Sequence, residues 1–392
     1  MSDDHAFDGI TIEAMRKKRG AKWQRYGDQV LPCFVADMDF GLALPIHQVL
    51  SEQLAAQDYG YTMGFADRPL AEIFAAWAER RFNWTVDAGR IEGLVDVVQG
   101  IYLTMHLFTE PGDGVVTLTP TYPPLWQSID RMGRRLIDST LVRGTQHYEI
   151  DFDDLRSKLD ANTKLMLLCN PHNPTGRVFN RSELESLAEL VLEHNLIVLA
   201  DEIHADLVYT PHRHIPFATL SPEIAERTIT MTSATKSFNL GGLRFAIAIF
   251  GSQALQDRFN AWPKGALGGL NSLGILATET AWRDCDDWLD ALVRYLKGNR
   301  DFVYDELKSR IPLIDVFSPE GTYLAWLGCE RLAINPDPFE HFLEAGKVAF
   351  SPGPNFGSGG DGFVRMNFAT SRSIAGELLD RVVASLPAPT RP

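Results

Sequence analysis

The sequence lacks long apolar runs, an apolar leader and paired cysteines. No stretch approaches the ~18 consecutive apolar residues of a membrane-spanning helix. Residues 1–23 place acidic before basic residues, which fits neither a secretory signal nor a transit peptide. The four cysteines form no CxxC pair, which argues against a zinc site and a disulfide framework: Cys33, Cys169, Cys285 and Cys329. We therefore expect a cytoplasmic protein without a bound metal.

Positive charge is also scarce. Lys and Arg number 37 against 51 Asp and Glu, for a net charge of −14. An acidic chain repels polyanions, so we expect neither nucleic acid nor an anionic membrane surface as a partner. With 392 residues the chain can bury a sizeable core, and small-molecule chemistry is the better expectation.

Short apolar runs flanked by turn residues predict buried β-strands. They cover residues 115–118, 165–169, 196–200, 228–232 and 245–250. Residues 182–194 carry a helical apolar repeat, and Ser182 with Glu185 fits a capping box. A strand, helix, strand unit predicts an α/β fold whose mostly parallel sheet is flanked by helices.

The pattern changes beyond about residue 273. A long helix over 284–309 and strands over 322–327 and 363–368 indicate a second, smaller α+β domain. We expect an N-terminal arm over 1–45 that contributes to this small domain. The large domain is then predicted over 46–275, and the small C-terminal domain over 276–392.

Polar residues follow three of the predicted strands. They form NPHNPTG at 170–176, DEIH at 201–204 and SATK at 233–236. Ligands collect at the carboxyl ends of parallel strands, so the three segments predict one shared site.

Each of these residues also has an ordinary structural interpretation. A lysine is usually solvated, but Lys236 follows a buried strand among small residues, where desolvation lowers the pKa and frees the amine as a nucleophile. Asp201 either caps a loop or pairs with a buried cation such as a pyridinium nitrogen. Asn170 and Asn173 fit simple turns, although two Asn-Pro pairs before Thr-Gly are a rarer combination.

The segments NPHNPTG, ADEIH and SATKSFNLGGLR resemble, in order and spacing, the fold-type-I pyridoxal-phosphate enzymes of the aminotransferase class I/II superfamily. The likeness covers essentially the whole chain. VADMDF (35–40), YGYT (59–62), PTYPPLW (120–126), DEIH and HIPFA (214–218) resemble the MalY/PatB-type C-S lyases, which include cystathionine β-lyases. The resemblance implies the large domain of that fold, pyridoxal 5'-phosphate as cofactor and an amino-acid substrate.

The resemblance also implies roles for the residues around the cofactor. Lys236 would bind it through a Schiff base, while Arg244 and Ser233 would contact its phosphate, for which a guanidinium is well suited. Gly100 and Ile101, at the start of a helix expected to run to residue 108, match the family's backbone grip on the phosphate. The alternative for Gly100 is an ordinary loop glycine.

The remaining matches concern the cofactor ring and the substrate. Tyr122 matches the aromatic over the ring, Asn173 would bond the ring hydroxyl, and His204 replaces the tyrosine of most aminotransferases in the superfamily. Tyr61 matches a residue that reaches the phosphate from the partner subunit, which implies an obligate homodimer with shared sites. Arg365, in an apolar strand, needs an anionic partner; the resemblance implies the substrate carboxylate, and a structural salt bridge is the alternative.

The expected function is a C-S β-lyase that converts cystathionine or another S-substituted cysteine to a thiol, pyruvate and ammonia. Lys236 would remove the Cα proton as general base, and Asp201 would keep the ring nitrogen protonated. The alternatives are an aminotransferase, or a decarboxylating or deaminating enzyme that acts on an S-conjugated cysteine. The sequence leaves the physiological substrate open.

Three other classes fit less well. Residues 233–236 match the S-x-x-K of serine acylases, but the S-D-N and K-T-G that those enzymes need do not occur. Residues 357–362 spell G-x-G-x-x-G, yet a predicted strand follows instead of a helix, which rejects a dinucleotide site. A sensor with a DNA-binding module is not expected, because the fold begins near residue 1.

Overall fold

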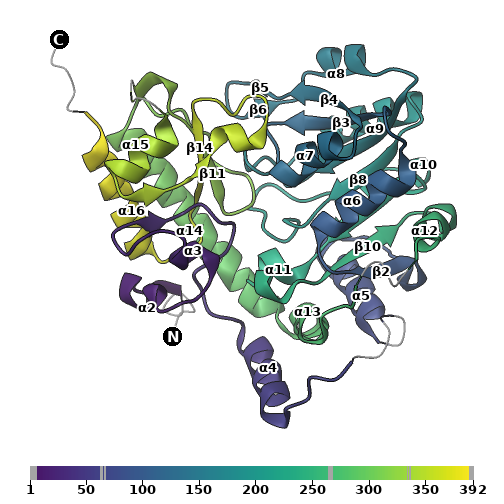
Figure 1. Cartoon of the computed structure of the whole chain (residues 1–392), viewed down its shortest axis with the longest axis horizontal. Helices are drawn as coiled ribbons and strands as arrows, with labels where there is room; N and C mark the ends of the chain where they lie inside the picture. Colours follow the sequence, from purple (N-terminus) through teal and green to yellow (C-terminus); the bar gives the residue numbers. More distant parts are fainter. Residues whose placement is uncertain are drawn as a thin grey trace.

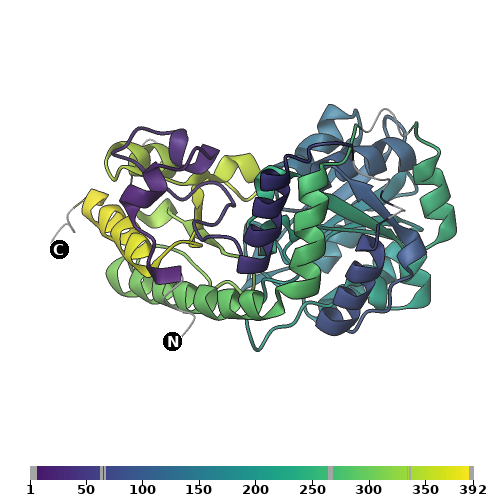
Figure 2. The same cartoon turned by 90° about the horizontal axis from the view of Figure 1, so that it is seen from below.

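The computed structural model describes residues 7–61, 65, 68–263, 268–332, 334 and 337–387. Two lobes lie side by side, and the long helix α14 Asp286–Arg310 runs along one of them (Figure 2). The larger lobe contains a seven-stranded sheet in the order β2-β10-β9-β8-β7-β3-β4. Its strands are β2 Ile91–Leu94, β3 Gly114–Thr119, β4 Arg135–Thr140, β7 Thr163–Cys169, β8 Ile197–Asp201, β9 Thr228–Thr232 and β10 Ala246–Phe250.

The five strands from β9 to β4 are parallel, and β10 is antiparallel to both β9 and β2. The predicted mostly parallel sheet is therefore confirmed, with each predicted strand within two residues of an observed one. The strands are continuous apolar runs in the sequence because both of their faces are buried. In β7, Met166 and Leu168 belong to the core on one face of the sheet, while Leu165 and Leu167 belong to the core on the other.

Helices cover both faces of this sheet (Figure 1). Two helices contribute to the hydrophobic cores on opposite faces of the sheet. Leu184 and Leu187 of α9 belong to the core on one face, and Ile101 and Met105 of α6 belong to the core on the other. The helices of this lobe are α4 Leu44–Ala56, α5 Leu70–Phe82, α6 Val97–Phe108, α7 Pro123–Arg131, α8 Phe152–Lys158, α9 Arg181–Glu193, α10 Pro222–Ala225, α11 Ala234–Ser237, α12 Gln253–Asn260 and α13 Ser272–Asp284.

The start of α9 differs from the prediction. The expected capping box of Ser182 and Glu185 is wrong, because Asn180 caps the helix. The Asn180 side chain accepts a hydrogen bond from the Glu183 amide at 3.0 Å, and the Glu183 carboxylate accepts from the Asn180 amide at 2.8 Å. Asparagine is as good an N-cap as serine, so the earlier of two possible boxes forms and Ser182 lies inside the first turn.

The smaller lobe contains the three-stranded antiparallel sheet β11-β14-β13 and a parallel pair, β1 with β12. The pairing of β1 with β12 brings the N-terminal segment into this lobe. The predicted helix over 284–309 corresponds to α14. The elements are α2 Ile12–Arg16, α3 Ala21–Gln24, β1 Leu31–Pro32, α14 Asp286–Arg310, β11 Leu324–Gly328, α15 Pro338–Glu344, β12 Val348–Ala349, β13 Ser351–Pro352, β14 Phe363–Asn367 and α16 Arg372–Ser385.

The remaining elements are short. They are the hairpin strands β5 Val142–Arg143 and β6 Tyr148–Glu149, and the 3-10 helices η2 Ala88–Arg90, η3 Phe217–Thr219, η4 Gly241–Leu243, η6 Glu330–Leu332 and η7 Gly353–Phe356. The G-x-G-x-x-G segment leads into strand β14, as predicted. Across the described ranges, no helix combines the length and apolarity needed to cross a membrane.

Candidate active site

The ends of three neighbouring strands bring the predicted polar segments together. Asp201, the last residue of β8, pairs in register with Cys169 of β7 and Met231 of β9. The Asn170 amide donates to the Asp201 carbonyl oxygen at 3.1 Å. The segments that follow β7, β8 and β9 therefore share one edge of the sheet, as their positions in the sequence predict.

Lys236 lies on α11, the single turn that follows β9. Ser233 caps this turn by accepting a hydrogen bond from the Thr235 amide at 3.0 Å. The Lys236 amine is turned inward and donates to the Ala36 carbonyl oxygen at 2.8 Å. Burial lowers the pKa of this amine below its usual value, against the opposing attraction of Asp37 and Asp201. Lys236 is therefore not an ordinary solvated surface lysine.

Asp201 is 3% exposed, and its carboxylate accepts a hydrogen bond from the Ile203 amide at 3.3 Å. Burial raises the pKa of Asp201 to about 7, while the Ile203 amide and the charge of Lys236 act against this rise. Among the described residues, no basic side chain forms an ion pair with this carboxylate. A buried carboxylate in this condition is a good partner for a cationic ligand group.

Arg365, on β14 of the smaller lobe, is 5% exposed and faces the same site. Its Nη1 donates to the Asn173 side-chain oxygen at 3.0 Å, and its Nη2 donates to the Phe34 carbonyl and the Ser351 hydroxyl at 2.7 and 3.1 Å. These acceptors are neutral, and its buried Nε has no partner within the described chain. The structural salt bridge considered for Arg365 is absent from the described residues, so its charge is unmatched.

His204 and Tyr122 complete this central group. Burial lowers the pKa of the His204 imidazole to about 3, and the positive charges of Lys236 and Arg365 reinforce that shift. Its buried Nδ1 has no partner among the described residues. Burial raises the pKa of the half-buried Tyr122 to about 12, with Asp201 adding to the rise and Arg365 opposing it. The structure thus brings six predicted residues together: Lys236, Asp201, Asn173, Arg365, His204 and Tyr122.

A second group lies where α6 begins. Asp96 caps the helix by accepting from the Gln99 amide at 2.8 Å, and its other oxygen pairs with Arg244 at 2.9 Å. The Ser233 hydroxyl donates to the Phe245 carbonyl at 2.6 Å. The first two amides of α6, at Val97 and Val98, have no acceptor within the helix and carry the positive end of its dipole. This end of α6 can hold an anion.

Gly100 and Ile101, expected at the start of a helix, are the fourth and fifth residues of α6, and their contact with the cofactor phosphate stays a prediction. The Gly100 amide donates to the Asp96 carbonyl oxygen at 3.3 Å, and that of Ile101 belongs to the regular helical ladder. Gly100 is not a loop glycine: a side chain there would collide with Met231 on β9. The Asp-x-x-Gln spacing at 96–99 was the sequence signal for the true helix start.

Tyr61 stands apart from all of these residues. Its side chain is fully exposed, at 108% of the reference area, beyond the end of α4. Thr62, the last residue of the YGYT segment, lies outside the described residues. The assignment of Tyr61 to a partner's site stays a prediction.

Several contacts that support the site have no signal in the local sequence. Glu202 accepts from the Phe217 amide at 2.8 Å and lies 2.9 Å from His214 Nε2, which ties the DEIH segment to the HIPFA segment. Asp206 accepts from the Ser237 hydroxyl at 2.8 Å and thereby anchors the turn that carries Lys236. Pairing of these groups across the fold had no local signal.

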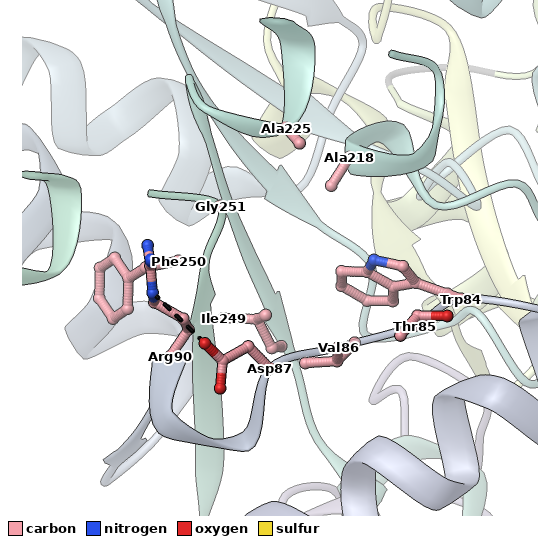
Figure 3. Close-up of a pocket in the computed structure, with 10 residues that line it drawn as sticks. All are labelled: Trp84, Thr85, Val86, Asp87, Arg90, Ala218, Ala225, Ile249, Phe250 and Gly251. Carbon is pink, nitrogen blue, oxygen red and sulfur yellow. Dashed lines mark ion pairs between the residues drawn. The ribbon is translucent and has the colours of Figure 1, made fainter. Parts of the chain in front are cut away.

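A surface pocket of about 220 Å³ lies elsewhere in the larger lobe (Figure 3). It contains Trp84, the Asp87–Arg90 ion pair and Ile249 of β10. Phe250, at the end of antiparallel β10, pairs with Ile229 at the start of β9. The pocket is thus at the opposite edge of the sheet and contains none of the predicted site residues.

Comparisons with known proteins agree with this geometry. The family model described as aminotransferase class I and II matches residues 41–382. The cystathionine beta-lyase PatB of Bacillus subtilis is 35% identical over 94% of this chain and 97% of its own. Relatives named as aspartate aminotransferases match at lower identity.

Two solved structures show the same fold. Cystalysin from Treponema denticola, which contains a pyridoxal 5'-phosphate cofactor, has a TM-score of 0.91, with 30% identity over 98% of each chain. The pyridoxal-phosphate-bound C-S lyase from Staphylococcus hominis has a TM-score of 0.89, with 29% identity over 97% of this chain and 98% of its own.

Proposed function

Because the chain belongs to the aminotransferase class I and II family, we propose that it is a pyridoxal-phosphate-dependent C-S β-lyase. It cleaves cystathionine or another S-substituted cysteine to a thiol, pyruvate and ammonia. The observation that carries the proposal is the pair of unmatched buried charges near Lys236. The Asp201 carboxylate lacks a cationic partner, which a pyridinium ring would supply. The Arg365 guanidinium lacks an anionic partner, which an amino-acid carboxylate would supply.

The residues of the site fit pyridoxal phosphate. Asp201 suits the protonated ring nitrogen, and the half-buried Tyr122 offers an aromatic face for the ring. Asn173 accepts from Arg365 through its oxygen and has an amide nitrogen to donate to the ring hydroxyl. Arg244, Ser233 and the first amides of α6 form a place for the phosphate.

Bound pyridoxal phosphate would supply an electron sink that draws electrons away from Cα of the substrate. The chain supplies the rest. Burial lowers the pKa of the Lys236 amine, which favours its role as nucleophile and then as acceptor of the Cα proton at Nζ. Arg365 orients the substrate by bonding both oxygens of its carboxylate. Asp201 keeps a proton on the ring nitrogen, and elimination then releases the thiolate from Cβ.

Transamination and decarboxylation are the alternatives, since relatives of lower identity are named aminotransferases. With an S-substituted cysteine and no keto acid, we expect continuous release of free thiol and pyruvate over many turnovers. Elimination needs no second substrate, whereas transamination stops after one turnover until a keto acid accepts the nitrogen. Thiol and pyruvate assays make the measurement. A single turnover that resumes on adding a keto acid contradicts the lyase assignment, as does carbon dioxide release with an aldehyde.

We also propose an obligate homodimer with shared sites. The support is a group of exposed large apolar side chains on and after α4, which lies at the edge of the molecule (Figure 1): Leu44, Leu54, Tyr59 and Tyr61. Exposed apolar side chains gathered along one segment are typical of protein–protein interaction sites. The support for a cytoplasmic location is four free, buried cysteines. The domain limits at residues 45 and 275 are part of the same proposal.

Mixing Tyr61→Ala and Lys236→Ala proteins is expected to restore activity that neither has alone. In a mixed dimer, one of the two sites contains both native residues. Complete random exchange should recover up to about a quarter of wild-type turnover. Exchange is checked with differently tagged subunits, and mixing Lys236→Ala with itself is the control. Absence of recovery after proven exchange contradicts the placement of Tyr61 in the partner's site.

A further inference from the structure

Tyr323 and Lys236 share one hydrogen-bond acceptor. The Tyr323 hydroxyl donates to the Ala36 carbonyl oxygen at 2.8 Å, and the Lys236 amine donates to the same oxygen at 2.8 Å. The phenol oxygen and the amine nitrogen are therefore at most about 5.6 Å apart. Tyr323 comes from the smaller lobe, Lys236 from the larger lobe and Ala36 from the N-terminal segment, so only the folded chain unites them.

A strained turn directs Tyr323 to this place. Thr322 has a φ of +65°, a conformation that β-branched residues rarely adopt. The larger lobe holds the turn: the Thr322 amide donates to the Leu207 carbonyl at 2.7 Å, and the Tyr209 hydroxyl donates to the Thr322 carbonyl. Such strain persists only where the surroundings hold it, and it is concentrated at functional sites.

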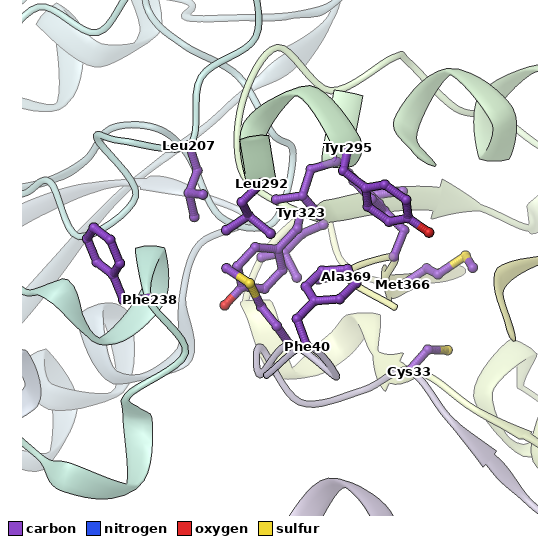
Figure 4. Close-up of a cluster of buried hydrophobic side chains, with 14 of the residues drawn as sticks. Cys33, Phe40, Leu207, Phe238, Leu292, Tyr295, Tyr323, Met366 and Ala369 are labelled. Carbon is purple, nitrogen blue, oxygen red and sulfur yellow. The ribbon is translucent and has the colours of Figure 1, made fainter. Parts of the chain in front are cut away.

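The surroundings of Tyr323 keep its hydroxyl protonated, so that it can donate a hydrogen bond. The ring is 1% exposed within the apolar cluster between the lobes, near Leu207 and Phe40 (Figure 4). The His204 ring lies edge-on to it, with 6.0 Å between ring centroids. Burial raises the pKa of Tyr323 well above its usual value, with Asp37 adding to the rise and Arg365 opposing it. The phenol therefore stays protonated through the neutral range.

We propose that Tyr323 is a positioning residue for Lys236. The inference rests on the proposed function, in which the amine leaves the cofactor, accepts the Cα proton of the substrate and later returns. The Ala36 carbonyl holds the amine near the substrate while it is free. When the amine moves away, the Tyr323 hydroxyl still donates to the half-buried Ala36 carbonyl, so the movement leaves no unpaired acceptor.

The decisive variant is Tyr323→Phe, and the matched control is Tyr295→Phe. Tyr295 belongs to the same apolar cluster (Figure 4), but its hydroxyl bonds Asp8 and the Arg372 amide instead of the site. Both variants lose one buried hydroxyl and keep the ring. The readout is exchange of the Cα proton of L-alanine for deuterium, followed by proton NMR in heavy water. Alanine has no leaving group, so this exchange is independent of C-S cleavage.

For Tyr323→Phe we expect exchange to fall about tenfold to a hundredfold, because a free amine displaced by about 1 Å transfers protons poorly. The affinity for pyridoxal phosphate, the visible absorbance of the holoenzyme and the KM should stay within about threefold. After a pulse of substrate, the absorbance of the lysine-bound cofactor should return more slowly. For Tyr295→Phe we expect lower thermal stability with exchange within about twofold of wild type.

Several results would overturn the proposal. These are unchanged exchange in Tyr323→Phe, an equal loss in Tyr295→Phe, or a loss of cofactor affinity and absorbance in Tyr323→Phe. Exchange by the wild-type enzyme without thiol release from any S-substituted cysteine would overturn the lyase function alone. If Tyr323→Phe does not fold, a fluorinated tyrosine at position 323 keeps the shape and alters the acidity of the phenol. An exchange rate unaffected by that replacement overturns the inference as well.

Discussion

Lys236→Ala is expected to yield a folded but colourless protein with turnover lower by about four orders of magnitude or more. The side chain supplies both the amine that bonds the cofactor and the base that takes the Cα proton. The Lys236 amine donates a hydrogen bond to the Ala36 carbonyl. After the substitution, this carbonyl still accepts a hydrogen bond from the Tyr323 hydroxyl. We therefore expect the fold to persist, with a thermal midpoint within a few degrees of wild type.

The measurement combines absorbance with covalent trapping. Wild-type protein is incubated with pyridoxal phosphate, reduced with borohydride and digested, and the labelled peptide should contain Lys236. Lys164→Ala is the matched control, because the Lys164 amine also donates to a backbone carbonyl, at 2.7 Å, but from an exposed position. A colourless wild-type protein, or label on a peptide without Lys236, contradicts the assignment.

Asp201→Asn is expected to retain part of the cofactor and lose activity by about a hundredfold to a thousandfold. The amide has nearly the same shape and still accepts from the Ile203 amide, but it cannot hold a proton on the ring nitrogen. Asp39→Asn is the control, because Asp39 is another buried carboxylate but pairs with Lys22 at 3.0 Å. Near-normal turnover in Asp201→Asn would show that Asp201 only caps the end of its strand.

The same variant is expected to change how stability depends on pH in the cofactor-free protein. The folded pKa of Asp201 is about 7, while an unfolded aspartate titrates near pH ~4. Between these values the folded state binds a proton that the unfolded state releases, so stability falls as pH rises through this window. The loss is on the order of 3 to 4 kcal/mol, and Asp201→Asn should remove it. Urea unfolding at pH 4.5 and 8 tests this; identical pH dependence in both proteins contradicts it.

Local features of the structure were readily predicted from the sequence. The strands β7, β8 and β9 and the helix α9 lie within two residues of their predicted positions. Their signals are apolar runs and periodicities of fewer than fifteen residues, together with nearby turn residues. The error at the start of α9 arose where two neighbouring capping boxes were possible, and α6 begins three residues before the expected position at Gly100.

By itself, the sequence determined the class of chemistry, because motifs such as SATKSFNLGGLR and NPHNPTG place a lysine, an arginine and asparagines after strands of a parallel sheet. Only the tertiary structure decided how distant residues meet. Arg365 contacts Asn173 across 192 positions, and Lys236 contacts Ala36 across 200. Propensity and periodicity act over one element, whereas these contacts depend on how the two lobes pack. The burial that shifts the pKa values of Lys236 and Asp201 has the same origin.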